Sequence, residues 1–154
     1  MYRGCAELPD LCRKRGSKGM IGREEKKSND LFYTCSLIDY IARKTKNRRK
    51  DIVDALGEER ITKIYHLANV YHSENIDQVS DDFIEDAKIT EGTFDSVART
   101  KYALPFHWDI GKVFKRLILG ISKEKQEEVI PALFEAYHSF VSEKIEDFNS
   151  SFYY

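Results

Sequence analysis

The chain has 154 residues, a hydrophobic fraction of 42% and a formal net charge of -1. This length suits one domain around a single core, and the apolar content excludes a wholly disordered chain. The near balance of charge argues against a general nucleic-acid coat protein, which needs a strongly basic domain. No stretch approaches the roughly 18 apolar residues that span a bilayer. The sequence therefore predicts a soluble protein.

Residues 1–27 differ in composition from the rest of the chain. They hold eight Lys/Arg against four Asp/Glu, a local net charge of +4, and four of the eight glycines. Because this segment has no helical or alternating apolar pattern, we expect a poorly ordered basic tail. Residues 28–154 are then the single helical domain. The segment also lacks the continuous apolar region of a secretory signal.

Three cysteines, Cys5, Cys12 and Cys35, make an odd count in a chain with no predicted export signal. This pattern favours free thiols in a reducing cytoplasm. Cys5 and Cys12 are too far apart for the usual zinc-ligand spacing, and no second Cys or His pair completes a tetrahedral set. We predict neither a metal site nor a cofactor.

The first three predicted helices follow from apolar spacing and capping residues. Ser28, Asn29 and Asp30 form an N-cap region before a helix over about 31–44. Asn47 is expected to cap a second helix that Gly57 stops. A third helix carries a stripe from Ile61 to Tyr71 and ends near His72.

The fourth predicted helix opens at Asn75, where Gln78 three residues later resembles a capping box, and runs to Ala87. A fifth, shorter helix is expected over 94–102, and it must finish before Pro105 because proline disfavours the helical conformation of the residue before it.

Two further helices complete the prediction. Asp109 is expected to cap a strongly amphipathic helix that Gly120 stops. Ser122 should start the last and longest helix, which Pro131 kinks or splits. No run alternates with period two over a useful length. The sequence therefore predicts an all-α fold, an irregular bundle of six or seven helices.

A basic turn at residues 43–50 reads RKTKNRRK. Its cations are Arg43, Lys44, Lys46, Arg48, Arg49 and Lys50. The first three lie at a predicted helix C-terminus, where the helix dipole favours positive charge. The last three lie in the first turn of the next helix, where the dipole opposes them and free N–H groups attract anions. The turn is either an anion- or partner-binding site or a surface turn that is solvated or paired with the chain's own acids.

An acidic face on the fourth predicted helix is the counterpart of the basic turn. Its acids are Glu74, Asp77, Asp81, Asp82, Glu85 and Asp86. Asp77, Asp81 and Glu85 are expected to stack on one side of the helix. Such a face is usually solvated, and it lacks the loop of a calcium-binding hand. A basic partner or the basic tail would complement it.

One segment suggests an enzyme. Arg60 and His66 resemble the Arg-x(4–6)-His element of helical ribonucleases of the HEPN superfamily, in which both residues act on the RNA backbone. Here Ile61 replaces the polar residue that usually follows the arginine. Six residues of helix also place the two side chains roughly 120° apart, so they would converge across a dimer or a bent helix.

Three segments together resemble a group of small, largely uncharacterised helical bacterial proteins. They are FYTCSLIDYIARKTKNRRKDIVDALG, LANVYHSENIDQVSDDFIEDA and KYALPFHWDIGKVFKRLI, which fall within about residues 31–118. Genes of that group often neighbour ADP-ribosyltransferase-like toxin genes, so the resemblance implies a binding partner. It implies no catalytic residues.

These observations lead to one hypothesis and two alternatives. The leading hypothesis is a non-enzymatic cytoplasmic interaction module, the neutralising or accessory component of a toxin-antitoxin type locus. The alternatives are a dimeric HEPN-like ribonuclease that uses Arg60 and His66, and a nucleic-acid binder that uses the basic turn. We expect a protein partner, with a toxin as the first candidate. Nucleic acid and a second copy of the chain stay open as partners, and no membrane partner is expected.

Overall fold

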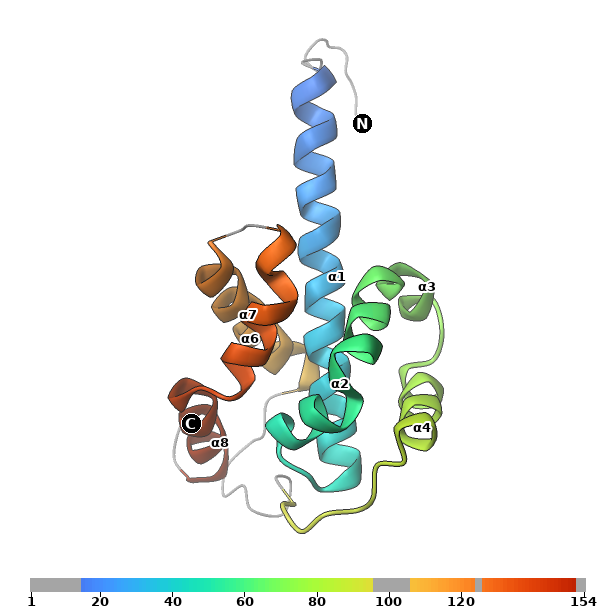
Figure 1. Cartoon of the computed structure of the whole chain (residues 1–154), viewed down its shortest axis with the longest axis vertical. Coiled ribbons are helices and arrows are strands. Elements are labelled where there is room, and N and C mark those ends of the chain that lie inside the picture. Colours follow the sequence, from blue (N-terminus) through green and yellow to red (C-terminus); the bar gives the residue numbers. More distant parts are fainter. Residues whose placement is uncertain (1–14, 96–105, 124–125, 152–154) are drawn as a thin grey trace.

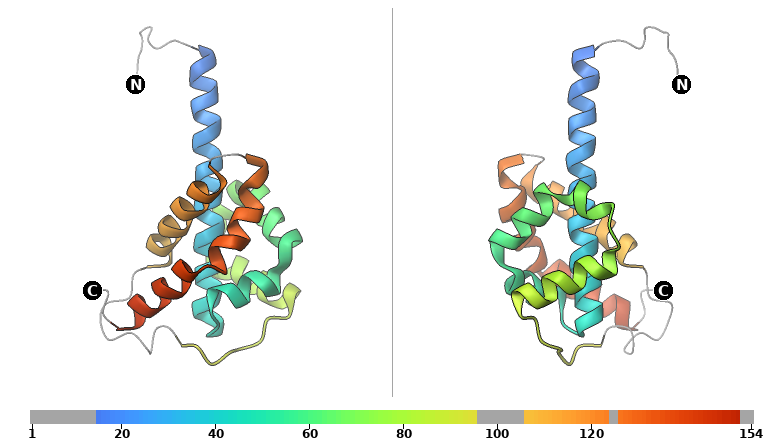
Figure 2. Two further views of the ribbon diagram at one scale, coloured as in Figure 1. Left: turned by 60° about the vertical axis from the view of Figure 1, so that its left-hand side comes forward. Right: turned by 90° about the vertical axis from the view of Figure 1, so that its right-hand side faces the viewer.

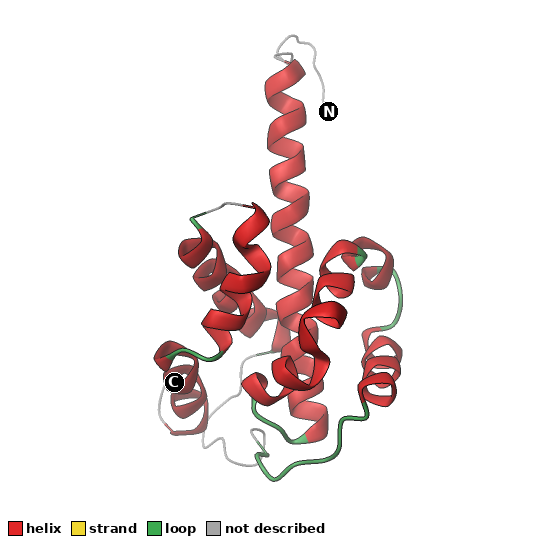
Figure 3. Cartoon of the chain, viewed as in Figure 1, coloured by secondary structure: helices red, strands yellow, loops and turns green. Residues whose placement is uncertain are grey.

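The computed structural model describes residues 15–95, 106–123 and 126–151, with side chains over 27–95, 106–123 and 127–145. These residues form helices joined by loops (Figure 3), which confirms the predicted all-α fold. The elements in chain order are α1 Arg15–Thr45, α2 Arg49–His66, α3 Ala68–His72, α4 Ile76–Ala87, α6 His107–Ser122, the short 3-10 helix Gln126–Glu128, α7 Val129–Tyr137 and α8 Phe140–Ser151.

Helix α1 is the central element, and α2, α3, α4 and α6 all pack against it (Figure 1). Leu31, Cys35, Ile38 and Ala42, which recur at helical spacing within the predicted helix 31–44, are buried. From Leu31 onward, side chains on the other faces of the helix are buried too, so this part of α1 is covered on most sides. In each view the first part of α1 projects beyond the other helices (Figure 2).

Helix α1 begins at Arg15 rather than near residue 31, so the predicted start was wrong. Residues 15–27 lack an apolar stripe, and for that reason apolar periodicity gave no sign of a helix there. Asp30, predicted to belong to the N-cap, is buried inside the helix, and its carbonyl accepts a hydrogen bond of 2.8 Å from Thr34 Oγ1. The prediction for residues 1–14 lies outside the described residues.

The basic turn reverses the chain between α1 and α2. Lys46 adopts a left-handed φ of 59°, and Asn47 N donates to Ala42 O at 3.0 Å, which closes the end of α1 in a Schellman-type cap. Arg48, not Asn47, occupies the N-cap position of α2, so that prediction was wrong. The Asn47 amide instead donates to Thr90 O at 3.0 Å, where it holds the loop that follows α4.

The break predicted at Gly57 is present inside α2, where this residue has φ 79° and ψ 166°. Only glycine adopts these angles at little cost, so the chain bends here before the helix resumes. The predicted third helix, from Ile61 to near His72, is divided at Leu67 between the end of α2 and the short helix α3, which ends at His72 as predicted. Asn75 caps α4 by accepting a hydrogen bond of 2.8 Å from Asp77 N, also as predicted, whereas Gln78 donates to Asp82 rather than back to the cap.

Helix α6 lies closely against α1. It starts at His107 after an N-cap at Phe106, three residues before the predicted cap Asp109, and continues past Gly120 to Ser122, so both predicted limits were wrong. Gly111 lies on the inner face, where an added Cβ would come 2.2 Å from Ser36 Oγ and 3.0 Å from Ser36 N. The absence of a side chain at this position lets the two helices approach each other.

The C-terminal segment forms two helices rather than one long helix from Ser122. The chain breaks after Tyr137, not at Pro131. Pro131 lies in the first turn of α7, where a missing N–H costs no internal hydrogen bond. The predicted fifth helix lies mostly outside the described residues, and Phe94 belongs to a loop in which its N–H donates to Lys46 O at 2.9 Å.

Candidate interaction surfaces

A buried ion-pair cluster accounts for two cations of the basic turn. Asp39 on α1 is 1% exposed, and its two carboxylate oxygens lie 2.6 Å from Arg49 Nε and 2.7 Å from Arg43 Nε. Arg49 is itself only 4% exposed. The Arg43 pair follows the expected i, i+4 spacing. The Arg49 pair joins α1 to α2, and no local sequence pattern predicts it.

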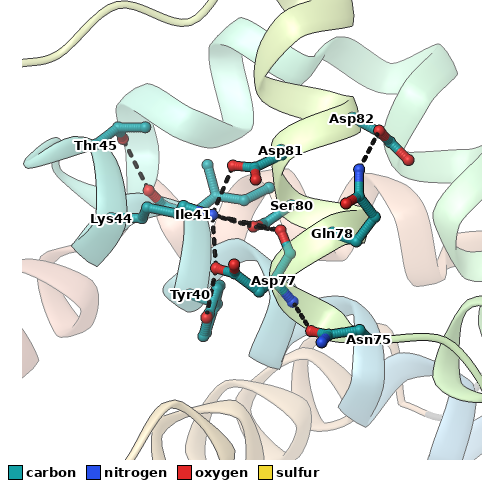
Figure 4. A network of polar contacts seen from close by, with 10 residues as sticks. All are labelled: Tyr40, Ile41, Lys44, Thr45, Asn75, Asp77, Gln78, Ser80, Asp81 and Asp82. Atoms are coloured by element: carbon teal, nitrogen blue, oxygen red, sulfur yellow. Dashed lines mark hydrogen bonds and ion pairs between the residues drawn. The ribbon is translucent and has the colours of Figure 1, made fainter.

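Lys44 joins the basic turn to the acidic face (Figure 4). Its Nζ lies 2.6 Å from carboxylate oxygens of both Asp77 and Asp81 on α4, and it donates to Ser80 Oγ at 3.2 Å. Tyr40 also donates to Asp77, at 2.9 Å. The hydrogen bond from Lys44, and then that from Tyr40, lowers the pKa of the Asp77 carboxyl below its usual range. The two predicted patches therefore face each other within one chain.

The other cations of the turn make weaker contacts. Lys46 Nζ lies 3.1 Å from a carboxylate oxygen of Glu91, with both side chains well exposed. The guanidinium of Arg48 lies 4.2 Å from the ring centre of Phe94, at cation–π distance. For Lys50 no acidic or aromatic partner is found among the described residues.

The two residues of the ribonuclease motif occupy different environments. Arg60 Nε donates to Asp86 Oδ2 at 2.7 Å, and its other nitrogens bond to the carbonyl oxygens of Leu56 and Asp86. This contact fixes α2 to α4 and lowers the pKa of Asp86. His66 lies on the same helical segment of α2 with an exposed side chain. The guanidinium is thus directed to α4, about 120° around the helix from His66.

The remaining acids of the acidic face are solvated. Asp82 accepts a hydrogen bond of 3.1 Å from Gln78, and Glu85 is exposed. No group of three His, Cys, Asp or Glu residues in the described ranges lies close enough to hold a metal ion.

An aromatic seam lies where Trp108 of α6 meets rings from α1 and α3. Trp108 contacts the rings of Phe32, His107 and His72 at centroid distances of 5.5, 4.7 and 5.8 Å. Burial lowers the pKa of His107 below its usual value, so its imidazole is neutral at neutral pH. These rings are largely packed against each other, which is the usual role of such a cluster at the edge of a core.

Two core residues, Cys35 and Tyr137, have titratable side chains that are buried away from solvent. Cys35 is fully buried as a free thiol, and burial raises its pKa to about 12. Tyr137 of α7 stacks on Phe114 of α6 with ring centres 4.2 Å apart. A thiol with so high a pKa is an inert core group. Cys5 and Cys12 lie outside the described residues.

His138, at the corner between α7 and α8, bonds through both ring nitrogens. Nδ1 lies 2.8 Å from Phe134 O, and Nε2 lies 2.9 Å from Asp54 Oδ1 on α2. Both partners accept hydrogen bonds, so the ring satisfies both when it carries two protons. The hydrogen bond to Phe134, followed by that to Asp54, raises the pKa of His138.

The outer face of α6 carries cations that the sequence analysis did not single out. Lys112 and Arg116 are exposed one turn apart, and no ion pair involving either is found in the described ranges. Val113 lies beside them on the same face and is 42% exposed. The segment KVFKR at residues 112–116 carries these cations among the apolar residues of the helix.

Comparison with protein-family models, curated proteins and solved structures found no significant match to this chain. No helix in the described ranges is both long and apolar enough to cross a membrane.

Proposed function

We propose that this chain is a non-enzymatic interaction module that acts in the cytoplasm as the neutralising or accessory component of a toxin-antitoxin type locus. The outer face of α6 carries the proposal. It displays Lys112, Val113 and Arg116 on a helix whose opposite face is buried against α1. Charged and apolar side chains held together on a rigid element suit a protein interface.

The pairing of the other charged residues supports binding rather than catalysis. Arg60 already bonds to Asp86, so an RNA-cleaving role would require this contact to open first. The basic turn is similarly engaged, because Lys44 and Arg49 contact carboxylates of the same chain. A ligand for either group would have to displace an existing partner.

The test is affinity purification of the tagged chain from its host, with separate analysis of bound protein and bound RNA. We expect a protein in stoichiometric amount that survives nuclease treatment and forms the complex again from purified components. If that protein slows growth when expressed alone, and the chain relieves the effect, the role is neutralising. If it does not slow growth, the role is accessory.

Recovery of RNA alone would overturn the proposal. So would RNA cleavage by the purified chain without added metal that is lost in His66→Ala. His66 is the better residue for this test than Arg60, because its exposed side chain can be removed without breaking the contact between α2 and α4.

A further inference from the structure

The exposed side of α6 forms one continuous stripe along the helix. Its members are Asp109, Lys112, Val113, Arg116 and Gly120, and all are exposed. At 100° per residue these positions fall within an arc of about 100°. Phe106, at the N-cap, is 72% exposed and stands three residues before Asp109. The spacing of Phe106, Asp109, Val113, Arg116 and Gly120 alternates three and four residues, as in the contact seam of a helix pair.

Gly120 has no evident purpose within the described part of the chain. Its φ is not positive, and nothing lies within 4 Å of the position of an added Cβ. The left-handed residue that ends α6 is Lys123, not this glycine. Glycine is among the least favourable residues in a helix. Gly111 on the opposite face is explained by its contact with α1, whereas the space at Gly120 is left open by the described residues and would admit a docked element.

The charge on α6 indicates the chemistry of that element. Residues 106–123 contain four Lys/Arg and one Asp, a net charge of +3, whereas residues 49–95 contain five Lys/Arg and twelve Asp/Glu, a net charge of -7. Helix α6 and the acidic helix α4 lie on different sides of α1 (Figures 1 and 2). A partner that is acidic only locally can approach α6 without meeting the acidic side.

We infer that the outer face of α6 docks an acidic amphipathic helix of a partner protein. The inference rests on the proposed function and names the partner's contact chemistry. Apolar side chains of the docked helix would cover Val113, its carboxylates would pair with Lys112 and Arg116, and its backbone would approach closest at Gly120. A nucleic acid suits the face less well, because an extended polyanion would also meet the residues of the acidic side.

The test uses three fluorescent probes with the full chain: a synthetic peptide of about three heptads with leucine at the contact positions and glutamate beside them, the same peptide with lysine for glutamate, and a single-stranded thymidylate oligonucleotide. We expect anisotropy titrations to give saturable binding of the glutamate peptide alone. The double variant K112E/R116E should weaken it at least about tenfold.

Two control variants separate the α6 face from general charge. K63E/K144E changes the net charge equally at two exposed lysines on other helices and should leave the affinity within about twofold. Gly120→Leu should leave the thermal midpoint equal or higher, because leucine favours the helix. It should nevertheless weaken peptide binding at least about fivefold, because the leucine side chain fills the space that the peptide backbone would occupy at Gly120.

Equal weakening by both double variants, stronger binding of the oligonucleotide, or no binding of the glutamate peptide would overturn the inference. The two proposals can fail separately. If the host partner is recovered and K112E/R116E still binds it with full affinity, the docking face on α6 is wrong, but the chain is still an interaction module that uses another face.

Discussion

The turn at residues 43–50 and the outer face of α6 both carry lysine and arginine, but these side chains differ in exposure and in ion pairing. In the turn, Arg49 is buried against Asp39 and Lys44 lies between two carboxylates of α4. On α6, Lys112 and Arg116 are exposed, and no ion pair is found for them in the described ranges. The denser cluster in the sequence is therefore the less accessible one.

The difference follows from what each segment is packed against. The turn lies between α1 and α2 and beside α4, so its long side chains reach carboxylates on neighbouring helices. The stripe on α6 faces away from α1, and its one acid, Asp109, lies on the same exposed side. Charge density along the chain thus predicts poorly which cations are available to a partner.

The largest expected effect is at Asp39. Asp39→Asn removes the charge that Arg43 and Arg49 share and leaves Arg49 buried without its carboxylate. We expect a loss of about 3–5 kcal/mol in the free energy of unfolding, measured by urea denaturation. Asp51→Asn, at an exposed acid in the first turn of α2, is the control and should change it by less than about 1 kcal/mol, the size of its interaction with the helix dipole. A loss below about 1 kcal/mol for Asp39→Asn would mean that the turn is not held by this pair.

The two glycines of α6 provide a matched comparison of its faces. Gly111→Ala should lower the free energy of unfolding by about 1–3 kcal/mol, because the new Cβ meets the backbone and side chain of Ser36. Gly120→Ala should raise it by up to about 1 kcal/mol, because the methyl group enters open space and alanine favours the helix. Thermal melts of both variants check the prediction, and effects of the same sign would contradict it.

A smaller effect is expected at Lys44. Its side chain is 31% exposed and its partners Asp77 and Asp81 are more than half exposed, so solvent screens the pairs. Lys44→Ala should cost up to about 1 kcal/mol. The difference from wild type should shrink when urea denaturation is repeated in 1 M NaCl, where the Debye length is about 3 Å. A salt-independent difference would indicate lost packing instead.

The smallest effect concerns Lys50 and His138. Because the pKa of His138 is raised in the folded chain, its contribution to stability is fully present below the unfolded pKa of about 6.5 and is lost as pH rises through the folded value. Because the pair of His138 with Asp54 is exposed to solvent, its contribution to the free energy of unfolding is limited to a few tenths of a kcal/mol. Nearby Lys50 lowers the pKa of His138, so Lys50→Gln should raise it further. NMR titration of the ring measures both values, and an unchanged pKa in the variant would contradict the prediction.

Several elements were readable from sequence because their signals are local. Asn75 begins α4 and Gly57 interrupts α2 through their own side-chain or backbone chemistry. Other limits were missed because they depend on distant contacts. The start of α1 at Arg15 leaves no trace in apolar spacing, and the break after Tyr137 replaces the one predicted at Pro131. The division at residues 27 and 28 into tail and domain stays a prediction.

The sequence by itself determined the helical class and the positions of the buried stripes, because period, caps and glycines act within a few residues of each other. Only the tertiary structure decided which charges are available. Asp39 and Arg49 are ten residues apart, and Lys44 and Asp77 are 33 apart, so their pairing depends on how α1 packs against α2 and α4. Electrostatic contacts of a few ångströms are set by this packing, and no local pattern encodes them.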